Sequence, residues 1–130
     1  MKKPVIKITI TKEDTGYSAH ALVNNKSINT EGDSYDELKE NILDVVNLSF
    51  EEEGFTYSSD EIKIILDLES FFDFYKVINA KALSERIGMN HSLLSQYING
   101  MKKPSQAQTK KIFQGVQQLG KELAEIRLLL

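Results

Sequence analysis

Residues 82–100 read Ala-Leu-Ser-Glu-Arg-Ile-Gly-Met-Asn-His-Ser-Leu-Leu-Ser-Gln-Tyr-Ile-Asn-Gly, and this stretch decides the fold of the C-terminal half of the 130-residue chain. Gly88 predicts the end of a first short helix, because glycine reaches a positive φ angle without steric cost. Asn90 can cap a second helix by accepting a hydrogen bond from one of its early N–H groups. Five apolar residues have the spacing that turns both helices toward a shared core: Leu83, Ile87, Met89, Leu94 and Tyr97.

Two short helices joined by such a turn form a helix-turn-helix, in which the second helix enters the major groove of DNA. The predicted second helix leaves His91, Ser92 and Gln96 pointing outward. Glutamine can pair with adenine through two hydrogen bonds, and serine can contact more than one base. The alternative is an ordinary helical hairpin that binds no DNA, in which His91 is simply solvated. On the DNA-binding interpretation, the predicted contact residues are Lys81, Asn90, His91, Ser92, Ser95, Gln96, Lys102 and Lys103.

The residues that follow strengthen the DNA-binding interpretation. Asn99-Gly100 ends the second helix, the loop at residues 101–104 carries two adjacent lysines, and Ser105 can cap a further helix. Over about residues 79–119 the sequence resembles the Cro/C1 (XRE) helix-turn-helix family, in which the glycine turn and the later Asn-Gly…Lys-Pro-Ser loop recur. Lys81, Lys102 and Lys103 are then expected to contact phosphates. Such contacts position the domain on DNA without reading the base sequence.

The N-terminal part of the chain predicts a small α+β domain. Alternating apolar residues and turn signals predict three strands, at residues 5–11, 17–23 and 27–30. Ser34 and Glu37 are spaced as a capping box and open an amphipathic helix. We expect this helix to fray at Glu51-Glu52-Glu53, because like charges at a helix C-terminus are unfavourable, and to stop at Gly54. A fourth strand is predicted at residues 61–70. The predicted order is βββαβ, a layer of sheet and helix.

The rest of the C-terminal half predicts further helices. Phe71–Tyr75 is either the first helix of the C-terminal domain or a hinge packed on it. One long helix is predicted within residues 105–130, and Gly115 and Gly120 are each expected to weaken it by about 1 kcal/mol relative to alanine. Its apolar face consists of Ile112, Val116, Leu119, Leu123 and Ile126.

The apolar run Leu123–Leu130 either contacts a partner or folds back on its own domain. One helix-turn-helix covers a single half-site, and operator symmetry usually mirrors protein symmetry. We therefore predict a homodimer or a higher oligomer.

Charge is distributed unevenly along the chain. Residues 1–75 carry a net charge of −9, whereas residues 76–130 carry +6. A basic half suits DNA phosphates, and an acidic half repels nucleic acid and attracts a basic protein. The chain has no cysteine, no signal-like N-terminus and no apolar run near the roughly 20 residues that span a bilayer. These features predict a cytoplasmic protein without membrane contact.

The βββαβ order, the Gly32-Asp33-Ser34 entry to the helix and the C-terminal helix-turn-helix together resemble a HicB-type antitoxin. The resemblance implies a partial ribonuclease-H-like domain at residues 1–70 that binds HicA, a small basic RNA-cleaving toxin. It also implies a domain at residues 71–130 that binds operator DNA of the pair's own operon. Asn24-Asn25-Lys26 replaces the longer loop of many HicB proteins, which leaves room for a toxin other than HicA. The candidate apolar anchors for the toxin are Tyr17, Tyr35 and Phe55.

Two other functions stay open. Ribonuclease-H-like enzymes hold two metal ions with carboxylates, for which the sequence offers Asp14, Glu31, Asp33 and Asp67. The first strand carries no central carboxylate, and His20 has no second ligand at metal spacing, so we predict no catalytic residue, metal site or cofactor. The other possibility is a helix-turn-helix transcription regulator whose N-terminal domain senses a ligand or dimerises, without a toxin partner.

Overall fold

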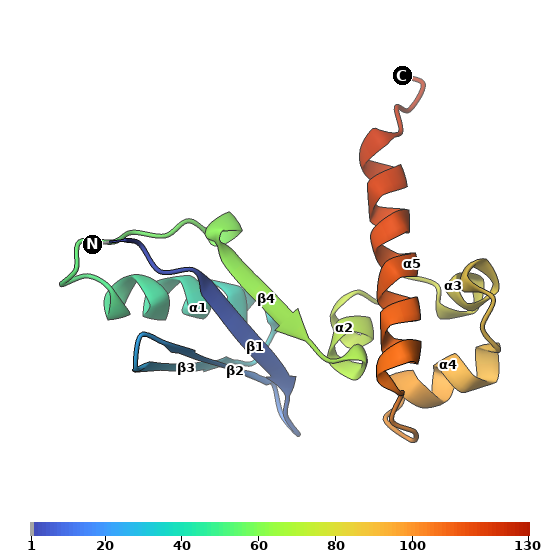
Figure 1. Cartoon of the computed structure of the whole chain (residues 1–130), viewed down its shortest axis with the longest axis horizontal. Coiled ribbons are helices and arrows are strands. Elements are labelled where there is room, and N and C mark those ends of the chain that lie inside the picture. The colour runs from blue at the N-terminus through green and yellow to red at the C-terminus, as the bar shows by residue number, and fades with distance from the viewer. Residues whose placement is uncertain (1) are drawn as a thin grey trace. The chain divides into compact units, whose positions relative to one another are not determined.

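The α+β class predicted from the sequence is confirmed in a computed structural model, which describes residues 2–130. A four-stranded sheet and one helix come first in βββαβ order, and four helices follow (Figure 1). The chain divides into two compact units, Met1–Ser70 and Phe71–Leu130, which are described in turn.

The sheet of the first unit is mixed. Its strand order is β3-β2-β1-β4, with antiparallel β1/β2 and β2/β3 pairs and a parallel β1/β4 pair. Ile6, Ile8 and Ile10 of β1 are buried on one face of the sheet, while the intervening residues are exposed. This is the alternation expected of a strand with one face in the core. The strands are β1 (Ile6–Lys12), β2 (Tyr17–Val23), β3 (Lys26–Gly32) and β4 (Ile62–Leu66).

A two-residue turn joins β2 to β3. Asn24 and Asn25 both have positive φ angles, 49° and 67°. Such a pair is typical of a type I′ hairpin turn, whose twist matches that of the flanking strands. Val23 therefore pairs directly with Lys26. β3 begins one residue earlier and ends two residues later than the predicted range of 27–30, because its pairing with β2 runs over the whole length of β2.

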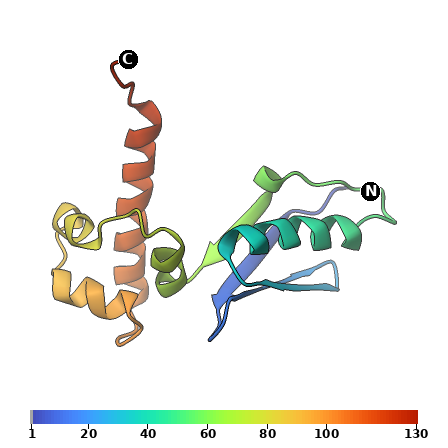
Figure 2. The same cartoon turned by 180° about the vertical axis from the view of Figure 1, so that it is seen from behind.

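The helix α1 (Tyr35–Ser49) begins as predicted at Ser34. The Ser34 hydroxyl accepts a hydrogen bond from the Glu37 N–H at 3.1 Å, and the Glu37 carboxylate accepts one from the Asp33 N–H at 3.2 Å. The helix packs along β2 and β3 (Figure 2). Its buried face consists of Leu38, Ile42 and Val46.

The predicted end of α1 at Gly54 is wrong, because the helix ends at Ser49. Phe50 is almost fully buried and leaves the helical path, and Gly54 belongs to the following turn with φ +79°. Lys26 holds this end of the helix: its ammonium donates to the Ser49 carbonyl at 2.7 Å and pairs with Glu53 at 2.6 Å. Acidic residues beside the negative helix end are unfavourable, which explains the early stop.

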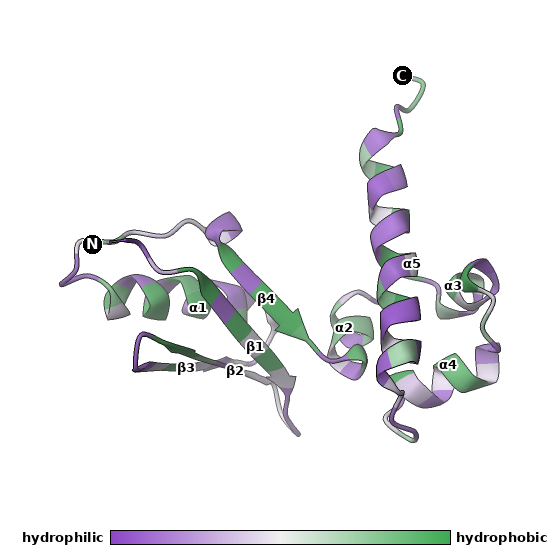
Figure 3. Ribbon diagram, in the orientation of Figure 1, coloured by the Kyte–Doolittle hydropathy of each residue, from purple (hydrophilic) through white to green (hydrophobic). Residues whose placement is uncertain are grey.

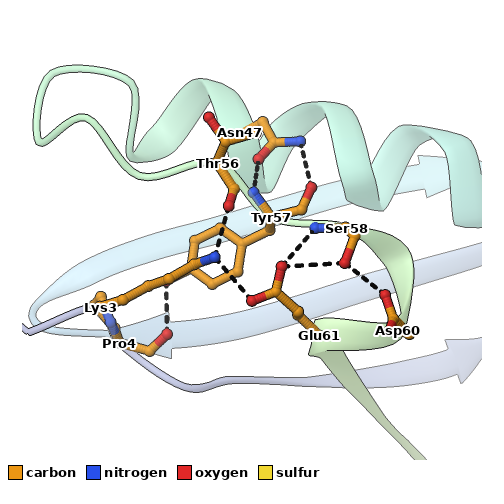
Figure 4. A network of polar contacts seen from close by, with 8 residues as sticks. All are labelled: Lys3, Pro4, Asn47, Thr56, Tyr57, Ser58, Asp60 and Glu61. Carbon is orange, nitrogen blue, oxygen red and sulfur yellow. Dashed lines mark hydrogen bonds and ion pairs between the residues drawn. The ribbon is translucent and has the colours of Figure 1, made fainter.

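A polar network attaches the segment after α1 to the sheet (Figure 4). The Asn47 side chain accepts a hydrogen bond from the Tyr57 N–H at 2.6 Å and donates one to the Tyr57 carbonyl at 3.1 Å. The Tyr57 hydroxyl donates to the Pro4 carbonyl at 2.6 Å, and burial raises the pKa of this phenol. Lys3 lies over the Tyr57 ring and pairs with Glu61 at 2.8 Å. The segment is thereby fixed against the chain that enters β1.

The prediction of a strand over residues 61–70 is wrong at its C-terminal end, because β4 stops at Leu66. The Asp67 carboxylate accepts a hydrogen bond from the Ser70 N–H at 2.7 Å, which is the geometry of a helix N-terminus. The helix α2 (Leu68–Phe74) follows at once. The apolar run at residues 71–75 is therefore mostly helix, in an element that begins before the end of the first unit and continues into the second. A single-turn 3-10 helix, η1 (Ser59–Glu61), precedes β4.

Three further helices form the second unit: α3 (Ala80–Ile87), α4 (His91–Ile98) and α5 (Gln106–Glu125). Leu83, Leu94 and Ile112, one from each helix, are buried in its core. Alternating hydrophobic and hydrophilic bands along α5 reflect its two faces (Figure 3). Of the apolar face predicted for α5, Ile112 alone is buried. Leu123 and Ile126 are 61% and 55% exposed, and the helix ends before Ile126.

Candidate nucleic-acid interface

The turn between α3 and α4 has the geometry that the sequence predicts. Gly88 adopts the left-handed conformation with φ +70°, and Met89 is buried beneath the turn. The Met89 N–H donates to the Ser84 carbonyl at 2.8 Å, which closes the end of α3. The Asn90 side chain accepts hydrogen bonds from the Ser92 and Leu93 N–H groups at 2.8 and 3.3 Å. Two helices of eight residues each are thus joined by three residues.

The outer face of α4 is polar and accessible. His91 and Ser92 are exposed, Ser95 and Gln96 are half-buried, and the next turn adds Asn99 at the C-terminal cap. At about 100° per residue these five positions lie within an arc of about 140°. Leu94 and Tyr97 are buried and point the other way, into the core of the unit. The arrangement therefore presents short polar side chains over the whole length of the helix.

Cations flank the two helices. Lys81 is exposed in the first turn of α3. Exposed Lys102 and Lys103 lie in the loop after α4, and the Lys102 N–H donates to the Gln96 carbonyl at 3.2 Å. That bond fixes the start of the lysine loop at the C-terminal end of α4. These positions can neutralise phosphates on either side of a groove-bound helix.

Helix α5 supports the α3/α4 pair from behind the turn. Gly115 lies so close to Ile87 that any side chain at position 115 would overlap it. Arg86 forms an ion pair with Glu122, and the hydrogen bond from Arg86 lowers the pKa of the Glu122 carboxyl. Both partners are about 40% exposed, so the pair adds little stability on its own. The close packing at Gly115 is the stronger constraint on how α3 is held.

Four of the eight predicted DNA contacts lie on α4, and a fifth, Asn90, caps its N-terminus. The carboxamide oxygen of Asn90 is used to cap the helix, so only its NH₂ group is available for a ligand. Sequence reasoning missed Asn99, which helical spacing from Ser95 could have found. It also missed Lys111, whose ammonium reaches the Gly88 carbonyl at 3.4 Å. That contact joins α5 to the turn and could not be read from the sequence.

The three predicted toxin anchors do not form one cluster. Tyr17 starts β2 and pairs with Gly32, and Tyr35 begins α1 three residues later, so both lie at one end of the sheet. Phe55 follows the other end of α1, where its ring lies 6.5 Å from that of Phe50. All three side chains are half-buried. Any partner that contacts both ends must therefore span the length of α1.

The residues considered for metal-dependent catalysis do not all gather in one place, although Asp14 and Asp67 line the same cavity. Asp14 lies in the β1–β2 turn, Glu31 lies in β3, and Asp67 follows β4. Within residues 2–130 no group of three or more histidine, aspartate or glutamate side chains is arranged to hold a metal ion. His20 forms a cross-strand hydrogen bond with Asn29, at 2.8 Å between Nδ1 and Oδ1. Its ring is thus engaged within the sheet.

Comparison of the chain with protein families, with curated proteins and with solved structures finds no match. None of the helices that the structure describes combines the length and apolar character needed to cross a membrane.

Proposed function

We propose that this protein is an antitoxin that represses its own operon through α3 and α4 and neutralises a small basic RNA-cleaving toxin, HicA-like in type, through its N-terminal unit. The observation that carries the DNA-binding part is the pair of eight-residue helices joined at Gly88, with a polar outer face on α4. A helix held in this way fits the major groove of B-DNA.

The charges of the two units support separate roles, with DNA binding in the second unit and toxin binding in the first. The lysines beside α3 and α4 belong to the basic part of the chain, where residues 76–130 carry +6. The first unit, which contains the sheet, lies in the acidic part of the chain, where residues 1–75 carry a net charge of −9. This negative charge makes the first unit a poor ligand for nucleic acid. An acidic surface accelerates encounter with a basic protein, while apolar contacts supply most of the affinity.

The DNA-binding part is tested with the purified full-length chain and a DNA duplex from upstream of its own gene. We expect a specific complex that survives excess unrelated duplex and weakens steeply with salt. Equal affinity for both duplexes would contradict sequence-specific repression.

The toxin-binding part is tested in cells that express the basic open reading frame beside the gene. Co-expression of the full chain is expected to restore growth, and the two proteins are expected to co-purify. If operator binding is observed but no neighbouring product is toxic, the plain transcription-regulator function replaces the antitoxin function.

A further inference from the structure

The outer edge of β4 is an unpaired strand edge. β4 is the last strand in the order β3-β2-β1-β4, so among the described residues no strand lies beyond it. Ile64 and Ile65 are 36% and 46% exposed, on opposite faces of the strand. The helix α1 packs on β2 and β3, which leaves the β4 end of the sheet less covered. An exposed apolar strand edge is a template for pairing with another strand.

Carboxylates gather where β4 ends. A cavity of about 330 Å³ lies there, and its lining includes Glu13, Asp14, Asp67 and Glu69 together with Lys12. Ser70 also lines this cavity; its side chain is buried, and its hydroxyl has no hydrogen-bond partner in the described structure. A buried hydroxyl without a partner is costly, and a donor entering the cavity would satisfy it. The chemistry of the cavity thus suits a cationic side chain that donates hydrogen bonds, such as arginine.

These charges decide between two possible occupants of the edge. A second copy pairing antiparallel about Ile64 would place Glu61 of one chain opposite Asp67 of the other, at both ends of the pair. Like charges directly opposite are destabilising, so the acidic ends oppose self-pairing. A strand from a basic protein has the opposite effect, because its cations meet the carboxylates while its apolar residues cover Ile64 and Ile65.

We propose that a β-strand of a basic protein adds to the free edge of β4 and places an arginine or lysine side chain in the cavity beside Ser70. The proposal rests on the toxin-binding function, for which it names the surface. Backbone hydrogen bonds along β4 supply pairing, and the carboxylates select a strand with a basic end.

The experiment uses the full-length chain and a short synthetic peptide with two arginines at each end and alternating valine and threonine between them. A peptide with glutamate in place of arginine is the control. Binding is measured by NMR titration, together with amide hydrogen exchange of residues 62–66. We expect the arginine peptide to bind and to slow exchange of the β4 amides that face away from β1. Absence of binding, equal binding of both peptides, or binding without protection of β4 would each overturn the proposal.

Charge-reversed variants separate the surface from the fold. Asp14→Lys combined with Glu69→Lys is expected to weaken binding of the arginine peptide by about tenfold or more, since two lining charges are reversed. Glu51→Lys combined with Glu52→Lys changes the net charge equally, at exposed positions in the turn after α1, and should have little effect. If both double variants weaken peptide binding equally, the weakening comes from the change in net charge, and the cavity beside Ser70 is not the binding site.

The same variants distinguish failure of the proposal from failure of the proposed function. If Asp14→Lys/Glu69→Lys still rescues cells from the toxin as well as the unmodified chain does, the surface is wrong and the antitoxin function stands. If the unmodified chain fails to rescue the cells, the antitoxin function is rejected. Strand addition at the edge of β4 is then tested by the peptide titration alone.

Discussion

Gly115 of α5 lies directly against Ile87 of α3, so closely that a β-carbon at position 115 would overlap the Ile87 side chain. Ile87 is the last residue of α3 before the Gly88 turn. Isoleucine is branched at its β-carbon and has few rotamers, so it cannot easily move aside. The glycine that weakens α5 as an isolated helix therefore allows α5 to approach the helix-turn-helix.

Gly115→Ala is expected to lower the free energy of unfolding. Overpacking a tight contact costs about 1–3 kcal/mol, which exceeds the gain of about 1 kcal/mol from better helix propensity. Gly120→Ala is the matched control, because nothing lies within 4 Å of a β-carbon at that position. It is expected to stabilise the chain by up to about 1 kcal/mol. Urea unfolding followed by circular dichroism measures both; a stabilised Gly115→Ala would show that α3 and α5 are less tightly packed.

This contact marks a limit of sequence reasoning. Local rules placed the ends of elements correctly where one residue decides them: Gly88 ends α3, Asn90 caps α4 and Ser34 caps α1. The same rules gave Gly115 and Gly120 equal roles, because a close approach by another helix leaves no mark in the local sequence. Only the packing of α5 on α3 separates the two glycines.

Two other differences have physical causes of the same kind. The alternation of apolar residues in β4 continues through Leu66 to Leu68 in α2, so periodicity extended the predicted strand to Ser70. The Asp67 carboxylate, which caps α2, is the signal that could have placed the boundary. For the candidate DNA interface, the sequence identified the face of α4 but not Lys111, which reaches the turn from α5.

Gln96→Ala tests base reading by α4. We expect it to cost about 1–3 kcal/mol of binding free energy on the best operator and to relax preference at one base pair, because glutamine reads adenine through two hydrogen bonds. Gln117→Ala, at an exposed position in α5, is the control. The measurement is affinity for a set of duplexes with single base changes. Unchanged discrimination in Gln96→Ala would remove this residue from the reading surface.

Lys102→Ala and Lys103→Ala test phosphate contacts. Each is expected to weaken binding to all sequences alike and to reduce the slope of log affinity against log salt by about 1. Lys7→Ala, an exposed lysine of β1, serves as the control for loss of one charge. Titrations at several salt concentrations give the slope. If the slope of either variant equals that of the Lys7→Ala control, the loop does not contact phosphate.

The ion pair of Lys3 with Glu61 predicts a dependence of stability on pH. The hydrogen bond from Lys3, supported by those from Ser58, lowers the pKa of Glu61 to about 2. An unfolded glutamate titrates at about 4.3, so the contribution is complete above that pH and is lost as the pH falls toward 2. Glu61→Gln should therefore reduce the loss of folding free energy that the unmodified chain shows between about pH 4.3 and pH 2. Glu51→Gln, in an exposed turn, should leave it in place.

Acid unfolding monitored by tyrosine fluorescence provides the measurement, because Tyr57 lies in the same network. An acid limb that is the same in Glu61→Gln and in the unmodified chain would show that the pair has no effect on folding. If Glu61→Gln and Glu51→Gln reduce the acid sensitivity of folding equally, the effect comes from the change in net charge and not from the Lys3–Glu61 pair.

The C-terminal segment predicts self-association of the full chain. Leu123 and Ile126 are more than half exposed, and Leu128, Leu129 and Leu130 are still more exposed, so the segment does not fold back onto its own unit in this structure. Several exposed apolar side chains within one short segment favour contact with a second copy. A chain truncated after Glu122 keeps the Arg86 ion pair and is expected to be monomeric by light scattering, whereas the full chain is expected to be dimeric or larger.

Substitution separates the role of this patch from the effect of shortening the chain. Leu123→Ser combined with Ile126→Ser should weaken the oligomer in the same direction as truncation does, because it removes two of the exposed apolar side chains that truncation removes. Leu22→Ser combined with Leu48→Ser changes two leucines of the sheet unit that are about 70% exposed, and it should leave the oligomer intact. Dissociation is also expected to weaken operator binding, since a single helix-turn-helix covers only one half-site. An oligomer that survives both truncation and Leu123→Ser/Ile126→Ser would place the interface elsewhere on the chain.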